Sequence, residues 1–327
     1  EPTAIRDLVH ALVAAGRPAP EPAVIDELID EAEGLPLYVV EALAGNERVA
    51  GAVPAGIRAL LQARLAALSD IATQVVAAAA VIGRSFDPDT VRQVSGRSDE
   101  ETVDASEELT RRGVIVEARR DEASGYDFTH ARLRDVSYEG TSVARRRLLH
   151  RRAAEAYRAL GTTAHDQLGR LARIARHEQE AGRSADAATA FEQAGGLAAT
   201  VYANQEALAY LEAALALGHP EVVALHEAIA DVRARVGDYP GAIAAFETAA
   251  ATAPPRRLAG IEHRVGRIHL RRGDLVAAEA HLAAALEAID LEDSAMSPLR
   301  SGIQADRAIV AARAGSLEQA TELASQA

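Results

Sequence analysis

Apolar residues recur at the spacing of helix turns along most of the chain, and this periodicity predicts a mainly α-helical protein. Within residues 1–53, short amphipathic segments end at glycines and at a proline-rich loop, which is typical of small helices. From residue 55 a longer segment places its apolar side chains on one helical face, at Ile57, Leu60, Leu61, Leu65 and Leu68. Ser69 or Asp70 is then placed to cap a helix that runs to Ile82 and is apolar nearly all round. We therefore predict a small helical unit over 1–53 and a second unit, opened by Pro54, around a buried helix.

The second unit continues with helical patterns over 87–94 and 98–112, followed by a β-hairpin of Val114–Glu117 and Tyr126–Phe128. Three helices followed by a hairpin is the element order of a winged helix, which we predict over 54–160 together with a basic linker helix. The usual partner of that fold is DNA. The helix that would read DNA, however, is acidic, because it carries Asp99, Glu100, Glu101, Asp104, Glu107 and Glu108 against Arg111 and Arg112. Phosphates repel such a helix, so we predict no direct DNA binding by this chain.

The end of the hairpin is the first place where the sequence pattern indicates a candidate functional residue. Thr129 is positioned to cap a new helix, whose first turn contains His130, and Arg132 and Arg134 follow. A helix N-terminus with basic neighbours favours anions, so His130 is a candidate phosphate contact. A capped or half-buried structural histidine is the plainer interpretation of the same residues. For the arginine-rich run 145–152, two interpretations likewise stay open: a solvated helix face, or a docking surface for an acidic partner.

From residue 161 the chain changes to alanine-rich helical pairs that repeat. Gly237 is followed by Ala242, Phe246, Ala249 and Pro254 at the spacing of a tetratricopeptide (TPR) unit around its turn. Similar sets begin at Gly182, Gly273 and Gly315, and a copy without glycine is marked by Ala207, Leu211 and Ala214. Small residues let paired helices approach closely, and a Phe or Leu fills the groove between them. We predict a TPR α-solenoid over 161–327, with Phe191, Phe246 and Leu282 buried between helices.

The composition of the chain excludes several kinds of functional site. The 327 residues include no cysteine and no lysine, so a disulfide framework, a P-loop lysine and a Schiff-base lysine are all excluded within this chain. The formal charge of −13 disfavours nucleic acid as a partner, and no uninterrupted apolar run is long enough to span a membrane. No paired catalytic carboxylates, nucleophile motif or histidine metal spacing stands out. We expect a cytoplasmic protein that is not an enzyme by itself and holds no metal.

Three local motifs carry a resemblance to a known family. Glu33–Leu43 is similar to the Gly-x-Pro element of a helical lid, Val53–Leu68 with Ala79–Gly83 resembles the opening of a winged helix, and Phe128–Val136 resembles a Phe-x-His-x-x-x-Arg element. Together they resemble the C-terminal part (lid, winged helix and TPR arm) of a bacterial signal-transduction ATPase with numerous domains (STAND). The TPR-bearing members in large LuxR-type regulators and in ATPase-linked nucleotide cyclases are the most similar.

That resemblance implies a role for two residues. Pro36 would lean on the base of a bound adenine nucleotide, and His130 would reach the β-phosphate of ADP and hold the resting state. It further implies ADP or ATP with Mg in the full-length protein, an upstream nucleotide-binding domain, a protein or small-molecule inducer on the TPR surface, and oligomerisation when active. The P-loop is absent from this chain, which alone should therefore not hydrolyse ATP. The rival interpretation is a constitutive TPR scaffold with a winged helix that does not bind DNA.

Overall fold

The computed structural model describes residues 7, 9–11, 55–120, 123–160, 167–289 and 296–327. The predicted lid unit lies outside these residues except for Asp7 and residues 9–11, which are helical, with Val9 buried. The chain divides into two compact units, one of residues 1–161 with 180–182 and one of residues 162–179 with 183–327. We call them the N-terminal unit and the arm. The described residues are mainly α-helical, as the periodicity predicted.

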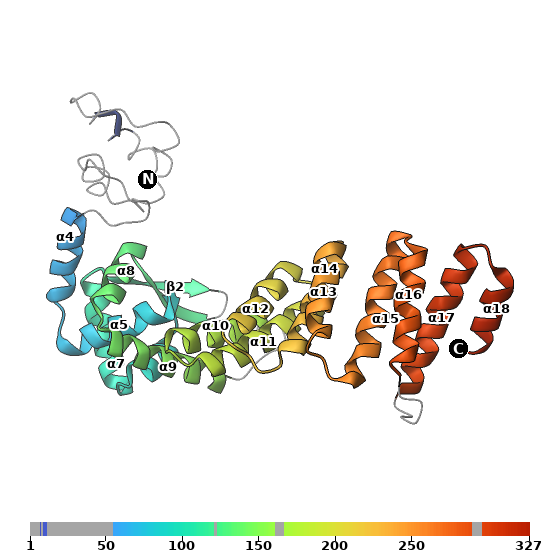
Figure 1. Ribbon diagram of the computed structural model, residues 1–327. Coiled ribbons are helices and arrows are strands. Elements are labelled where there is room, and N and C mark those ends of the chain that lie inside the picture. The colour runs from blue at the N-terminus through green and yellow to red at the C-terminus, as the bar shows by residue number, and fades with distance from the viewer. Residues whose placement is uncertain (1–6, 8, 12–54, 121–122, 161–166, 290–295) are drawn as a thin grey trace. The chain divides into compact units, whose positions relative to one another are not determined.

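The N-terminal unit is built around one buried helix, α5. Its elements are α4 (Ala55–Ala66), α5 (Asp70–Ile82), β1 (Ser85–Phe86), α6 (Pro88–Ser95), α7 (Asp99–Arg111), β2 (Ile115–Arg120), β3 (Ala123–Phe128), α8 (Ala131–Gly140) and α9 (Val143–Ala159) (Figure 1). The Ser69 side chain caps α5, which packs against α6, α7, α8 and α9 and buries most of its length. Leu109, Ile115, Phe128 and Leu133 complete the core. The nearly all-round apolar pattern of this segment therefore marks the centre of the unit.

The predicted hairpin is present and belongs to a three-stranded antiparallel sheet in the order β1-β3-β2. The short β1 was not predicted, because two residues are too few to show a period. It pairs Phe86 with Tyr126, and a Cβ at Gly125 would lie 2.9 Å from the Phe86 carbonyl oxygen. Gly125 therefore allows β1 to lie close against β3. Helix α4 buries Leu61, whereas Leu60 is 52% exposed.

The arm is a TPR-like solenoid of antiparallel helical hairpins. Its helices are α10 (Gln167–Glu180), α11 (Ser184–Thr200), α12 (Asn204–Ala216), α13 (Val222–Val236), α14 (Tyr239–Ala250), α15 (Pro255–Arg272), α16 (Leu275–Glu287), α17 (Ser297–Arg313) and α18 (Leu317–Ser325). From α11 onward each helix packs against the next, as Figure 1 shows. The residues predicted to fill the grooves, Phe191, Phe246 and Leu282, are all buried. This confirms the predicted fold of the arm.

The four turns predicted at glycines share one backbone geometry. Gly182, Gly237, Gly273 and Gly315 all have a left-handed φ, between +78° and +88°. In each turn the next N–H donates to the carbonyl five residues back, as in a Schellman motif. The copy without glycine places Tyr202 at the equivalent position, with φ +62°, and its turn makes the same hydrogen bond through Ala203 and Ala198. Gly182 and Tyr202 bound the same helix, α11, so the first two predicted copies share a helix.

Candidate functional site

The junction of β3 and α8, where the candidate phosphate contact lies, is fixed by contacts on its strand side. Phe128 is buried, and its ring meets that of Phe86 edge-on with centroids 5.9 Å apart. The Thr129 N–H donates to the Val114 carbonyl at 3.1 Å, and its hydroxyl donates to the Gly113 carbonyl at 2.8 Å. The prediction that Thr129 caps α8 was therefore wrong, because these carbonyls of the neighbouring segment take its hydroxyl.

His130 itself is the N-cap residue of α8. Its backbone is extended, with φ −140° and ψ 136°, and its side chain makes no capping hydrogen bond to the helix. The side chain is half-buried, and the first turn of α8 contains no acidic residue. The N–H groups at the start of α8 are thus not capped by the His130 side chain, and such groups attract anions.

The arginines behind His130 are partly neutralised within α8. Asp135 lies 3.9 Å from an Arg132 Nη atom and 3.6 Å from the Arg134 Nε atom. The site is therefore a weakly basic helix start with one histidine, which fits a single phosphate contact and not a complete nucleotide site. Pro36, the other predicted contact, lies outside the described residues, so its position relative to His130 stays a prediction.

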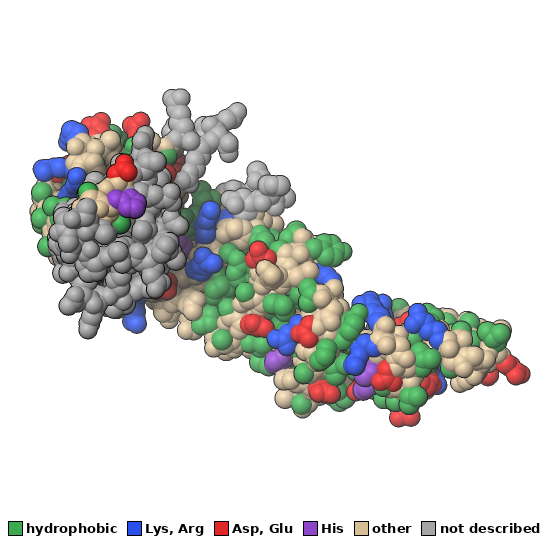
Figure 2. Space-filling model, turned by 90° about the horizontal axis from the view of Figure 1, so that it is seen from above, with side chains coloured by type: hydrophobic (Ala, Val, Ile, Leu, Met, Phe, Trp, Pro, Cys, Tyr) green, Lys and Arg blue, Asp and Glu red, His purple; other side chains and the backbone are tan. Residues whose placement is uncertain are grey.

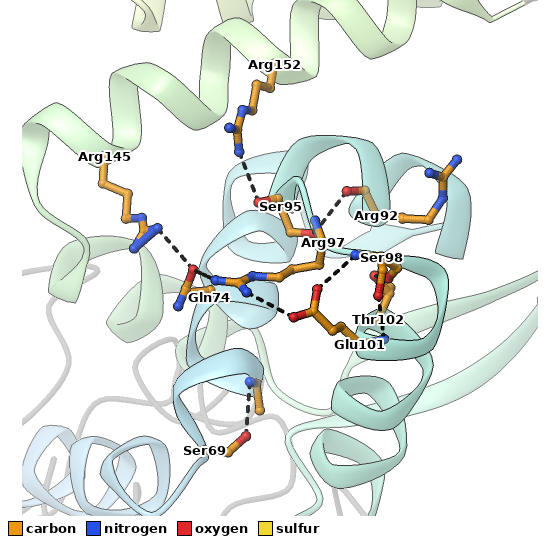
Figure 3. A network of polar contacts seen from close by, with 11 residues as sticks. Ser69, Gln74, Arg92, Ser95, Arg97, Ser98, Glu101, Thr102, Arg145 and Arg152 are labelled. Carbon is orange, nitrogen blue, oxygen red and sulfur yellow. Dashed lines mark hydrogen bonds and ion pairs between the residues drawn. The ribbon is translucent and has the colours of Figure 1, made fainter.

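Two arginines of the run in α9 make structural contacts that neither interpretation predicted. Figure 3 shows Arg145 and Arg152 pointing from α9 towards α5 and the end of α6. Arg145 donates to the Gln74 side-chain oxygen at 3.2 Å, and Arg97 donates to the same atom. Arg152 donates to the Val94 and Ser95 carbonyls at 3.3 and 3.0 Å and so satisfies the C-terminal end of α6. These two arginines fasten helices of the N-terminal unit together, whereas Arg147 and Arg151 are exposed, so for the rest of the run both interpretations stay open.

Several acidic residues of α7 also have internal partners. Glu101 accepts from the Ser98 N–H at 3.0 Å and from Arg97 at 3.1 Å, completing a capping box. Glu108 accepts from the Ser69 N–H at 2.9 Å and from its hydroxyl at 2.6 Å. These hydrogen bonds lower the pKa of both carboxyl groups, with Ser98 as the main cause for Glu101 and Ser69 for Glu108. Part of the negative charge of α7 therefore belongs to carboxylates whose hydrogen bonds stabilise the N-terminal unit.

A buried histidine, His150, lies on α9 within the same unit. Its Nε2 atom is 3.0 Å from the Tyr138 hydroxyl, and the two rings meet edge-on. Burial lowers the pKa of His150 to about 4, and the neighbouring Arg146 adds to the effect. The ring is neutral at pH 7, and sequence reasoning missed it because nothing in the local pattern separates it from the arginines around it.

The part of the chain that the structure describes contains no group of histidine and acidic side chains arranged to hold a metal ion. Among the same residues, no helix has the length and apolar character needed to cross a membrane.

Comparison with known proteins concerns the fold alone. No protein-family model matches the chain, and no curated protein matches it. The solved structure of YrrB, a TPR protein with an unusual peptide-binding site, is 19% identical over 54% of this chain and 81% of its own, with a TM-score of 0.40. MamA from Desulfovibrio magneticus RS-1 is 18% identical over 55% of this chain and 92% of its own, with a TM-score of 0.42. A STAND protein with a TPR sensor from Pyrococcus horikoshii is 12% identical over 100% of this chain and 59% of its own, with a TM-score of 0.37.

Proposed function

We propose that this chain is the regulatory portion of an ATP/ADP-dependent signal-transduction switch of the transcriptional-regulator type. In this proposal the N-terminal unit is a winged helix that docks beside a nucleotide-binding domain in the full-length protein. The arm receives a protein or small-molecule inducer. The order α5-β1-α6-α7-β2-β3, with the hairpin strand β3 at the centre of the sheet, supports the winged-helix interpretation.

The observation that carries the proposal is the position of His130 at the start of α8. The His130 side chain does not cap the helix, the first turn has no acidic residue, and the preceding strand is anchored by Phe128 and the residue after it, Thr129. A phosphate oxygen placed there would meet the positive end of α8 and a ring N–H of His130. The contact would hold the resting, ADP-bound arrangement, and an inducer that binds the open form better would shift the population towards it.

The remaining parts of a nucleotide site would come from outside this chain. Mg-nucleotide needs a P-loop lysine, and the chain has no lysine, so hydrolysis is assigned to the nucleotide-binding domain. Transcriptional output is likewise assigned to another domain, because the acidic α7 does not suit DNA.

The test is the ADP dissociation rate of the full-length protein and its His130→Ala variant, followed with a fluorescent ADP analogue. A hydrogen bond to a charged group is worth about 1.5–3 kcal/mol, so the variant should release ADP at least about tenfold faster and should switch on without inducer. His130→Gln is the matched control, because its amide keeps an N–H donor and should restore much of the affinity. Unchanged ADP release in His130→Ala would favour the constitutive scaffold.

A further inference from the structure

A groove on the arm collects arginines from two separate helices. It is lined by Asp231, Ala234 and Arg235 of α13, by Phe246 of α14, and by Arg264, Arg267, Ile268 and Arg271 of α15, and it encloses about 200 Å³. One carboxylate therefore faces four guanidinium groups, in a chain whose net charge is −13. Figure 2 shows arginine and acidic side chains close together on the visible face of the arm. The groove is a local exception to the acidity of the chain.

Helical spacing explains why these arginines meet. The lining residues of α15 recur three or four positions apart and so share one face of that helix, as Asp231 and Arg235 do on α13. The Arg264 guanidinium joins the two helices, since it donates to Asp231 at 3.0 Å and to Glu227. It also lies over the Phe246 ring, 5.1 Å from the centroid. Arg264 is thus a structural element of the groove wall.

The other arginines are less fully neutralised. Within the part of the chain that the structure describes, Arg267 pairs with Asp306 at 3.6 Å, and Asp306 also binds His263 at 2.7 Å. Arg235 donates to neutral oxygens, of Ala199 and Asn204, and lies over the Tyr202 ring. Arg271 is exposed, and among the described residues neither it nor Arg235 has a carboxylate at ion-pair distance. Asp231 pairs with Arg264 at 3.0 Å, and partial burial raises its pKa.

We infer that this groove binds an acidic peptide segment of a partner protein, with Arg235 and Arg271 as its principal carboxylate contacts. The inference rests on the proposed function only in taking the arm as the partner-binding part. The positive groups extend along two helices instead of converging on one point, which suits several carboxylates on one chain better than a single small anion. The guanidinium fork binds a carboxylate through two parallel hydrogen bonds, and the acidic remainder of the arm discourages binding elsewhere.

The experiment measures fluorescence anisotropy of a labelled nonapeptide, (Asp-Glu-Leu)₃, with the 327-residue chain. The same peptide with Asn and Gln in place of the acids is the neutral probe. Arg235→Glu/Arg271→Glu reverses the proposed contacts, while Arg256→Glu/Arg272→Glu makes an equal change of charge at exposed arginines of α15 outside the groove. Since Arg235 also contacts α11, Arg271→Glu alone is included, because that side chain makes no described contact. Circular dichroism checks that each variant is folded.

We expect saturable binding of the acidic peptide only, at least about tenfold weaker in Arg235→Glu/Arg271→Glu, weaker also in Arg271→Glu, and close to wild type in the control pair. Added salt should weaken it. Equal binding by the groove and control variants would overturn the proposal, as would preference for the neutral peptide or no binding of the acidic one. Full competition by millimolar glutamate or inorganic phosphate would also overturn it, in favour of a small-anion site. None of these results bears on ADP release, so the nucleotide switch is judged separately.

Discussion

Arginine side chains join helices in both the N-terminal unit and the arm, but in the examples that follow the joined segments lie farther apart along the chain in the N-terminal unit. In the N-terminal unit, Arg145 and Arg152 donate to uncharged oxygens of segments far away in sequence and so hold different helices together. In the arm, Arg264 and Arg307 pair with carboxylates of neighbouring helices. The packing of small and large apolar residues between helices is repeated from one hairpin to the next. The N-terminal unit therefore depends on single long-range contacts, whereas the arm depends on a local pattern. Substitutions and changes of pH should therefore affect the stability of the two units differently.

The largest expected effect is in the arm, at Phe246. Its side chain is fully buried between helices, so Phe246→Ala should lower the free energy of unfolding of the arm by about 3–5 kcal/mol, measured by urea denaturation. Val276→Ala is the control in the same repeat region, because Val276 is 84% exposed and should change stability by no more than about 0.5 kcal/mol. Equal effects of the two variants would contradict the packing register of the repeats.

The second perturbation acts on the N-terminal unit through pH. The pKa of His150 is about 4 in the folded protein, against an ordinary value of about 6.5, so the unfolded chain takes up a proton more readily. The stabilisation from the neutral ring is complete above about pH 6.5 and is lost as the pH falls towards 4, for a total of about 3 kcal/mol.

His150→Gln should remove this dependence, because the amide can keep a hydrogen bond to Tyr138 but does not titrate. We expect the wild type to lose about 2 kcal/mol more than the variant between pH 7 and pH 5, by urea denaturation at each pH. The pKa values of Glu101 and Glu108 are lowered, so the stabilisation that these carboxylates contribute is lost only at more acid pH. They therefore do not affect the comparison between pH 7 and pH 5. Parallel pH profiles for the two proteins would show that His150 does not control acid stability.

What could be predicted from the sequence follows the same division. The turns of the arm were predictable because glycine at a left-handed position and a Phe or Leu at fixed spacing are local signals. Even the turn at Tyr202 followed from Ala207, Leu211 and Ala214, although the residue itself does not favour that backbone. The helices of the N-terminal unit were predictable from their periodicity and, for α5, from the cap at Ser69.

The contacts between distant segments were not predictable. Whether Thr129 caps α8 depends on the Gly113 and Val114 carbonyls, which the fold brings beside it. Similarly, Arg152 finds the end of α6 only once α9 has packed there. The position of His130 at the start of α8 followed from the strand-helix pattern, while its neutralising neighbour Asp135 was not considered. The groove on the arm was missed because its arginines come from α13 and α15, and the sequence does not show that these two helices bring them together.

The smallest expected effect on stability concerns two glycines of α15 in the arm. A Cβ at Gly266 would lie 2.9 Å from the Leu282 Cγ atom and 3.3 Å from the Ala278 carbonyl oxygen, whereas a Cβ at Gly260 would meet nothing within 4 Å. Overpacking costs about 1–3 kcal/mol, which exceeds the gain of about 1 kcal/mol that alanine brings to a helix interior. Gly266→Ala should thus destabilise the arm by about 1 kcal/mol, while Gly260→Ala should stabilise it by about 0.5–1 kcal/mol. The two unfolding free energies, measured in urea under the same conditions, should differ by about 2 kcal/mol, since the helix and the substitution are the same and only the neighbour differs. Stabilisation by both substitutions would mean that Gly266 does not set the distance between α15 and α16, and that small residues at this repeat position reflect composition instead of close packing.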